Sequence, residues 1–182
     1  MSPVELLEAE HAPLAARPFF PAAGPASPIV GALAQVPELL EVAMPFIAVV
    51  FGPSSVDLRT KEIVVLRVSA KLGCRYCIQS HTVAAWDAGL SAQETRGLCG
   101  EPLSMGGRED ALVAWCDAFC AAPEPVPRAL TARLREHFAE HELVELALLA
   151  GATAMLNRFC TSLELPTGAA TLARFEAEGV AA

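Results

Sequence analysis

The stretch LRTKEIVVLRVSAKLGCRYCIQSH, residues 58–81, predicts two helices that meet at a glycine. Its first half carries Ile, Val and Leu on several sides, which is typical of a buried helix. Gly73 favours the end of that helix, because glycine adopts the left-handed conformation of a helix terminus at little steric cost. A second helix is expected from Cys74 to about Ala88, closed by Gly89.

The second helix carries two cysteines and a histidine along one stripe. At 3.6 residues per turn, Cys74, Cys77 and His81 fall within about 60° of one another around the helix axis. Both cysteines are expected in its first turn, where unpaired N–H groups and the helix dipole favour a thiolate over a thiol. The spacing therefore predicts a CxxC redox pair at the N-terminus of a central helix, with His81 placed to accept or return a proton.

The first helix supplies a carboxylate for this histidine. If the two helices fold back on each other at Gly73, an antiparallel pairing places Glu62 closest to His81. The expected order, Glu62, His81, Cys77 and Cys74, is that of a proton relay that ends at a thiol pair. In such a relay the carboxylate orients the imidazole and the imidazole keeps Cys77 as the thiolate. The thiolate attacks a hydroperoxide, the second thiol forms a disulfide with the product, and an external dithiol restores the pair, without a metal or an organic cofactor.

The rest of the chain also predicts helices, and no segment shows the period-two alternation of a half-buried strand. Residues 1–28 contain six of the fourteen prolines and are expected to form an extended N-terminal arm. Residues 29–182 are expected to form one all-α domain, a helical bundle. A helix from about residue 29 is expected to kink or end at Pro45. Further helices are predicted from Ser91, whose pattern is that of a capping box, and over residues 108–121, 129–138, 140–163 and 169–178.

Composition limits the classes of partner. The net charge of −8 argues against nucleic acid, which requires a basic face. Hydrophobic residues make up 53% of the chain, so part of its surface is expected to be buried between subunits. The longest charge-free apolar run, Val42 to Ser54, is shorter than the roughly 20 residues of a membrane span. The N-terminus has no basic segment before an apolar one, so we expect a cytoplasmic protein with reduced thiols.

Two other interpretations of the CxxC pair stay open at this point. Cys74, Cys77 and His81 are three possible ligands of a zinc ion, although a second ligand pair at the usual spacing is missing. The two thiols can also be inert packing residues. The four remaining cysteines have no histidine or acidic residue at a matching spacing, and we expect all of them to be inert: Cys99, Cys116, Cys120 and Cys160.

The residues of this stretch resemble the AhpD-like branch of the carboxymuconolactone decarboxylase family. The resemblance lies in LRTKEIVVLRV at 58–68, in GCRYC at 73–77, in a glutamate twelve residues before the first cysteine and in a histidine four after the second. Weaker similarity extends over residues 29–166. It implies an all-helical, cofactor-free homotrimer or hexamer that reduces hydroperoxides or disulfides, with a lipoyl- or thioredoxin-like dithiol as the external reductant.

The resemblance also implies a role for each site residue. Cys77 is then the peroxidatic thiol and Cys74 the resolving thiol, with Glu62 and His81 as the proton relay. Tyr76 is a possible accessory residue, because it stands where the best-studied AhpD proteins have a second histidine. A phenol with a pKa near 10 is a poor proton shuttle at neutral pH.

Two other functions remain as alternatives. One is the cofactor-independent decarboxylase or lactone chemistry after which the wider family is named, although those members generally lack the CxxC pair. The other is a non-enzymatic, oligomeric redox sensor that uses the same disulfide. The cysteine pair therefore predicts redox chemistry, and the sequence leaves its substrate open.

Overall fold

The computed structural model describes residues 2–100, 104–121 and 124–179, and these residues contain helices and no strand. The all-α prediction is confirmed. The helices are a short 3₁₀ helix at Arg17–Phe19, then α1 (Pro28–Leu33), α2 (Pro37–Phe51), α3 (Leu58–Leu72), α4 (Arg75–Asp87), α5 (Ala92–Cys99), α6 (Gly107–Cys120), α7 (Arg128–Arg135), α8 (Glu140–Ser162) and α9 (Ala169–Ala177).

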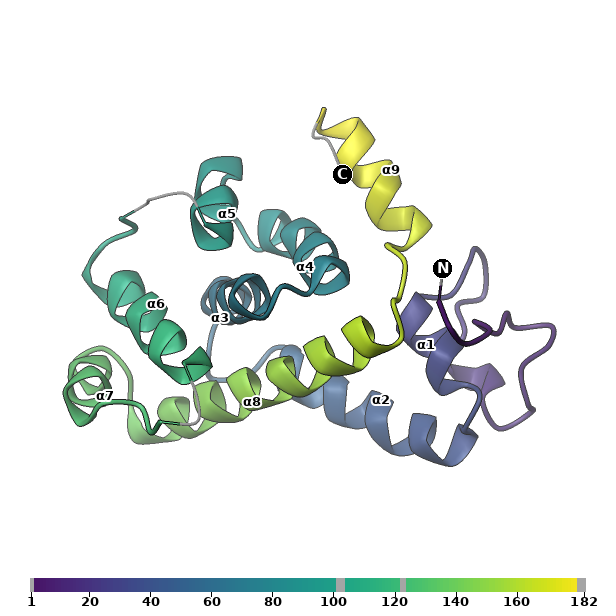
Figure 1. Cartoon of the computed structure of the whole chain (residues 1–182), viewed down its shortest axis with the longest axis horizontal. Coiled ribbons are helices and arrows are strands. Elements are labelled where there is room, and N and C mark those ends of the chain that lie inside the picture. Colours follow the sequence, from purple (N-terminus) through teal and green to yellow (C-terminus); the bar gives the residue numbers. More distant parts are fainter. Residues whose placement is uncertain (1, 101–103, 122–123, 180–182) are drawn as a thin grey trace.

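Helix α3 lies at the centre of the domain. It packs against α4, α5, α6 and α8, and Figure 1 shows it end-on with these four helices around it. Nine of its fifteen residues are buried, which agrees with the apolar pattern on several of its sides. The helix that follows the CxxC motif, α4, packs along one side of this central helix and also contacts α5, α8 and α9.

The ends of α3 and the start of α4 follow from local sequence. The Asp57 carboxylate caps α3 by accepting a hydrogen bond from the Thr60 backbone N–H at 2.8 Å. Gly73 ends the helix with a φ of 69°, in the left-handed region. Cys74 is the N-cap of α4 rather than a residue of its first turn, and its sulfur accepts a hydrogen bond from the Cys77 N–H at 3.4 Å.

The sequence predicted that the helix would kink or end at Pro45. It does not end there, because α2 continues through Pro45 to Phe51. Proline removes one backbone N–H and therefore frees one carbonyl of the preceding turn. Pro45 and Glu41, the residue four positions earlier, are both exposed, so water can bind the freed carbonyl. The helix is therefore able to contain the proline.

Helices α2 and α8 pack against each other and leave an exposed apolar surface, which we call the α2–α8 face. The two helices run along the same edge of the molecule in Figure 1. The large apolar side chains exposed on them are Leu39, Val42, Phe46 and Val49 on α2, and Val144, Leu148 and Met155 on α8. Only Leu40 and Val50 of α2 are buried, so most of the apolar pattern of this helix is directed outward.

The described part of the N-terminal arm is packed on the domain. Ala12 and Ala16 are buried in one apolar cluster with Val30 and Leu40. Leu7 donates a backbone hydrogen bond to the Gly31 carbonyl at 3.0 Å, and the side chains of Phe19 and Phe20 pack against the cluster. The arm therefore covers α1 and the start of α2.

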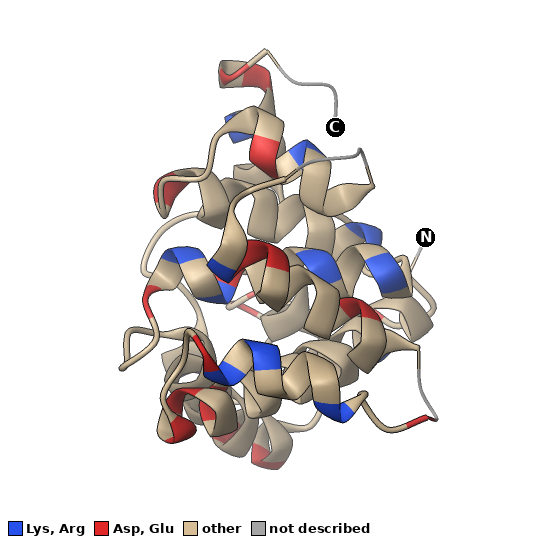
Figure 2. Cartoon of the chain, turned by 90° about the vertical axis from the view of Figure 1, so that its left-hand side faces the viewer, with Lys and Arg blue, Asp and Glu red and all other residues tan. Residues whose placement is uncertain are grey.

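Helix α8 is long and apolar enough to cross a membrane when judged by length and composition alone. A core helix passes the same test, and α8 packs against α2, α3, α4 and α7. In Figure 2 the Lys and Arg positions are interspersed with Asp and Glu positions along the helices. The negative net charge is therefore not gathered on one element.

Candidate thiol redox site

The two thiols of the CxxC motif lie next to each other. The Cys74 and Cys77 sulfurs are 2.7 Å apart, and both cysteines are free thiols. Cys74 is 1% exposed and Cys77 is 6% exposed, within a small apolar cluster that includes Leu165. The pair is close enough to form a disulfide on oxidation without movement of the backbone elements that carry it.

His81 and Glu62 form the second close pair of the site. The His81 Nδ1 atom lies 2.9 Å from Glu62 Oε2, so α4 is joined to α3 by the contact that the antiparallel pairing predicts. The Glu62 side chain is 9% exposed and that of His81 is 27% exposed. A hydrogen bond from Nδ1–H to the carboxylate leaves Nε2 as the free ring nitrogen. The Phe51 ring lies beside the imidazole, with the ring centroids 5.8 Å apart.

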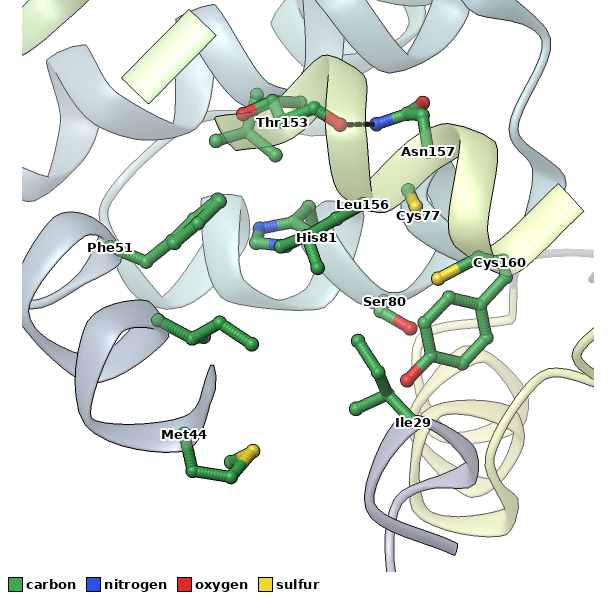
Figure 3. A pocket seen from close by; sticks show the side chains of 13 residues that line it. Ile29, Met44, Phe51, Cys77, Ser80, His81, Thr153, Leu156, Asn157 and Cys160 are labelled. Atoms are coloured by element: carbon green, nitrogen blue, oxygen red, sulfur yellow. Dashed lines mark hydrogen bonds between the residues drawn. The ribbon is translucent and has the colours of Figure 1, made fainter. Parts of the chain in front are cut away.

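Cys77 and His81 border the same cavity, which has a volume of about 160 Å³. Figure 3 shows their side chains together with Phe51 and Met44 from α2 and with residues of α8 around the same space. Most of the lining is apolar: Ile29, Met44, Ile47, Phe51, Val65 and Leu156. The Cys77 thiol, the His81 imidazole and an apolar surface thus face a single cavity.

Within the described part of the chain, His81 makes no direct hydrogen bond to either sulfur of the pair. The four residues that the sequence predicts for the site therefore form two contacting pairs, Glu62 with His81 and Cys74 with Cys77. The two pairs are connected only through the cavity that His81 and Cys77 share. A proton can pass between them through a water or substrate molecule in that cavity.

A third thiol, which the sequence predicted to be inert, belongs to the same cluster. Cys160 of α8 is 1% exposed and packs with Cys74 and Cys77. Hydrogen bonds from Cys160 and Cys77 lower the pKa of the Cys74 thiol to about 3, against the opposing effect of burial. Hydrogen bonding with Cys160 and then with Cys74 raises the pKa of Cys77, and hydrogen bonding with Cys74 contributes most to raising the pKa of Cys160 to about 12.

Within the cluster, hydrogen bonding lowers the pKa of Cys74 and raises the pKa of Cys77, whereas the sequence predicted Cys77 as the thiolate. Cys74 is the N-cap of α4, so its sulfur accepts the Cys77 backbone N–H, and the Cys77 sulfur lies 2.7 Å from it. No sequence signal could have identified Cys160, because it lies on a distant helix and has no partner at a characteristic spacing.

A second cavity, of about 610 Å³, borders the other side of the thiol cluster. It is lined by Cys74 and Cys160 together with more polar residues, among them Arg75, Thr161 and Thr167. Cys77 and His81 do not line it. The buried thiol pair therefore lies between two cavities, with Cys77 on the apolar side and Cys74 on the more polar side.

Tyr76 borders both cavities. Burial raises the pKa of its phenol to about 12, and hydrogen bonding with Ser80 and with the Ile29 backbone only partly opposes this effect. The phenol is thus protonated throughout the neutral range and can donate a hydrogen bond, but it does not release a proton there.

The remaining cysteines lie outside this cluster. Cys116 is fully buried in the main core, and burial raises the pKa of its thiol. Burial likewise raises the pKa of Cys99 and of Cys120. Among the described residues, no group of three or more His, Cys, Asp and Glu side chains is arranged to hold a metal ion.

Comparison with known proteins places this geometry in a family. The model of the carboxymuconolactone decarboxylase family matches residues 37–123, from α2 to the end of α6. The uncharacterized protein YdfG of Bacillus subtilis is 30% identical over 113 residues, which are 60% of this chain and 77% of that protein.

Solved structures share the fold. An uncharacterized peroxidase-related protein with an alkylhydroperoxidase AhpD core, from Ralstonia eutropha, superposes with a TM-score of 0.83 at 17% identity, over 93% of this chain and 94% of that chain. The debrominase Bmp8 superposes with a TM-score of 0.69 at 17% identity, over 81% of this chain and 80% of its own. At these identities the likeness concerns the fold alone. On the family match and the identity to its Bacillus relative, the chain belongs to the carboxymuconolactone decarboxylase family, and its fold is that of the AhpD-like proteins.

Proposed function

We propose that this protein is a thiol-dependent peroxidase that reduces small organic hydroperoxides with the Cys74–Cys77 pair. The observation that carries the proposal is the position of Cys77, which faces the same apolar cavity as His81 while the Cys74 sulfur lies 2.7 Å behind it. A nucleophile, a proton donor and a resolving thiol are thus arranged around one space.

The first step is attack of Cys77 on the peroxide. The Cys77 S–H proton passes to the adjacent Cys74 thiolate, and the Cys77 sulfur attacks the terminal oxygen of ROOH. The O–O bond breaks, Cys77 becomes a sulfenic acid, and the leaving alkoxide takes a proton to become ROH. His81 is placed to supply that proton from the cavity, and the Glu62 carboxylate holds the ring and stabilises its protonated form.

The second step forms the disulfide. The Cys74 sulfur attacks the Cys77 sulfenic acid, the S–O bond breaks, and the hydroxyl leaves as water with the proton that Cys74 had received. An external dithiol then attacks the disulfide and becomes oxidised, which returns both cysteines to thiols. The more polar second cavity borders Cys74, so it offers this reductant a route separate from the substrate cavity.

The cavity favours an organic substrate. Its volume of about 160 Å³ is comparable to an apolar protein cavity of about 150 Å³ that binds benzene. Apolar side chains form most of its wall, so an alkyl or aryl group gains free energy by leaving water there. Hydrogen peroxide has no such group, and we expect it to be the poorer substrate.

The same proposal includes assembly of several copies in the cytoplasm. The α2–α8 face exposes seven large apolar side chains on two adjacent helices. Exposed apolar surface of this kind typically marks a protein interface, and a second copy of the chain is the partner we propose for it, in a homotrimer or hexamer.

A thiol titration with and without peroxide tests the activity. Reduced protein is mixed with cumene hydroperoxide or with hydrogen peroxide, and we expect loss of two thiols and a mapped Cys74–Cys77 disulfide. Cys77→Ser is expected to abolish turnover, and Cys116→Ser, a buried core control, is expected to leave it unchanged. Full activity of Cys77→Ser would show that the proposal is wrong.

Three other outcomes would assign a different function. Lactone or decarboxylase activity that survives in the Cys74→Ser/Cys77→Ser double variant would indicate the chemistry after which the family is named. Release of bromide from a brominated pyrrole, with hydroperoxides left intact, would indicate a dehalogenase that uses the same thiols. A disulfide that changes the oligomeric state without appreciable turnover would indicate a redox sensor.

A further inference from the structure

Cys160 is the one thiol of the buried cluster that borders both cavities. With Cys77 it lines the apolar cavity, and with Cys74 it lines the larger and more polar one. Cys160 is 1% exposed and packs in one buried cluster with both other cysteines. Figure 3 shows the Cys160 side chain extending from α8 toward the same space as Cys77 of α4.

This position is not that of an ordinary packing cysteine. A packing thiol such as Cys116 lies in the main core, away from the CxxC pair. Cys160 instead belongs to the small cluster that holds both motif cysteines, although it is 83 residues from Cys77 in the chain. Any oxidised sulfur formed on Cys77 thus meets two neighbouring thiols rather than one.

We propose that Cys160 is a second resolving thiol, which condenses with oxidised Cys77 in competition with Cys74. The inference rests on the proposed thiol peroxidase function. The Cys160 thiol attacks the Cys77 sulfenic acid, an S–S bond forms, the S–O bond breaks, and the hydroxyl leaves as water with the Cys160 proton.

The resulting disulfide can then move within the cluster. The Cys74 thiol, which holds the proton taken from Cys77 in the first step, attacks the Cys160 sulfur; a Cys74–Cys160 bond forms, the Cys77–Cys160 bond breaks, and the Cys74 proton passes to Cys77, which leaves as a thiol. The number of electrons and protons in the cluster is unchanged by this exchange. Both sulfurs of the new disulfide border the polar cavity, and Cys77 is returned to the substrate cavity in its reduced form.

Removing Cys74 isolates the third thiol and tests the proposal. In Cys74→Ser, the hydroxyl retains an N-cap acceptor for α4, so we expect the helix to keep its start. After one equivalent of cumene hydroperoxide, this variant is expected to lose two thiols and to yield a Cys77–Cys160 disulfide in peptide mapping. Cys74→Ser/Cys160→Ser is expected to lose one thiol and to accumulate a sulfenic acid that dimedone labels at Cys77. Cys74→Ser/Cys116→Ser is the matched control and is expected to behave as Cys74→Ser.

A second oxidant separates failure of this inference from failure of the proposed function. Diamide forms disulfides between neighbouring thiols without a peroxidase step, and it is expected to form the Cys77–Cys160 bond in Cys74→Ser even if hydroperoxide is not a substrate. If both oxidants leave Cys160 free while Cys77 is oxidised, Cys160 is a packing residue and the inference is wrong.

The wild-type protein provides the measurement that does not depend on a variant. With half an equivalent of diamide, we expect peptides that contain Cys160 in a disulfide with Cys77 or Cys74, beside the Cys74–Cys77 product. A Cys74–Cys77 disulfide as the sole product in the wild-type protein, with Cys160 fully alkylated afterwards, would overturn the inference even if Cys74→Ser failed to fold.

Discussion

The Glu62 carboxylate lies 2.9 Å from Nδ1 of His81, and this contact joins the central helix α3 to the helix that bears the CxxC motif. The contact holds Nδ1 of the imidazole and leaves Nε2 without this partner, and the ring borders the same cavity as Cys77. The thiols form a separate contact, so the candidate site consists of two contacting pairs, each with one member at the same cavity.

Replacing Glu62 tests the first pair. Glu62→Gln removes the charge that orients and stabilises the imidazole, and we expect kcat/KM for cumene hydroperoxide to fall by roughly 10- to 100-fold, as loss of one charge-assisted hydrogen bond implies. The ¹⁵N shifts of His81 are expected to show loss of the fixed tautomer. Glu38→Gln, an exposed change in the first turn of α2, is the control. An unchanged rate in Glu62→Gln would exclude this carboxylate from the relay.

Tyr76→Phe tests whether the phenol takes part in proton transfer. Because burial raises the pKa of Tyr76 to about 12, the phenol does not titrate in the working range of the site. We expect the shape of the pH–rate profile between pH 6 and 9 to be the same in Tyr76→Phe as in the wild type, although KM can change because Tyr76 borders the cavity. Loss of one limb of the profile would show that Tyr76 carries a proton.

Lys61→Met tests a buried amine in the core, which the sequence analysis did not predict. Lys61 is 1% exposed, and its Nζ donates to the carbonyls of Val50 at 2.9 Å and Gly52 at 2.6 Å and pairs with Glu145 at 2.8 Å. Removal of one partner from such a buried network costs about 3 kcal/mol of unfolding free energy. Urea denaturation measures the change.

The control for this substitution is Lys71→Met in the same helix. Lys71 is 42% exposed and lies 3.7 Å from Asp117, so its loss is expected to cost under about 1 kcal/mol. Equal stability of the two variants would mean that the network around Lys61 contributes little to the fold.

Glu145→Gln tests how the free energy of unfolding depends on pH under acidic conditions. Burial alone would raise the pKa of Glu145, but hydrogen bonds from Lys61, Ser54 and Ser55 outweigh it and lower the pKa to about 2. The folded pKa is below the unfolded value of about 4.3, so the carboxylate stabilises the fold above that value and loses this effect as the pH falls toward 2. We expect the unfolding free energy of the variant to be lower at pH 7 and to decline less steeply between pH 5 and 2. A decline as steep as in the wild type would show that other carboxylates control acid unfolding.

Charged residues on the α2–α8 face test the proposed assembly. Val42 and Val49 are 71% and 76% exposed, and Val42→Asp/Val49→Asp is expected to lower the mass measured by light scattering to that of a single chain. An aspartate in an apolar interface loses its hydration without gaining a partner. Leu172→Asp on α9, far from α2 in Figure 1, is the control and is expected to keep the assembled mass. A wild-type protein that is already a monomer would remove this part of the proposal.

Local sequence was sufficient for the helices and for most of the site. Gly73 ends α3 because its φ is positive, and the spacing of the CxxC motif places both sulfurs on one side of the start of α4. The contact of Glu62 with His81 follows from the same hairpin, since two helices joined by one short turn have a restricted register. These features depend on residues that are close in the chain, so pattern and spacing predict them.

The features that depend on distant segments required the tertiary structure. Only the packing of α8 against α4 brings Cys160 to the thiol pair and, with it, the hydrogen bonding that lowers the pKa of Cys74 and raises the pKa of Cys77. Likewise, only the meeting of α2, α4 and α8 creates the apolar cavity that His81 and Cys77 share. Sequence by itself determined the helical fold and the residues of the redox motif, because these follow from local conformation. The tertiary structure decided the pKa values of the sulfurs and which cavity gives access to each sulfur, because both depend on the groups that surround a buried atom.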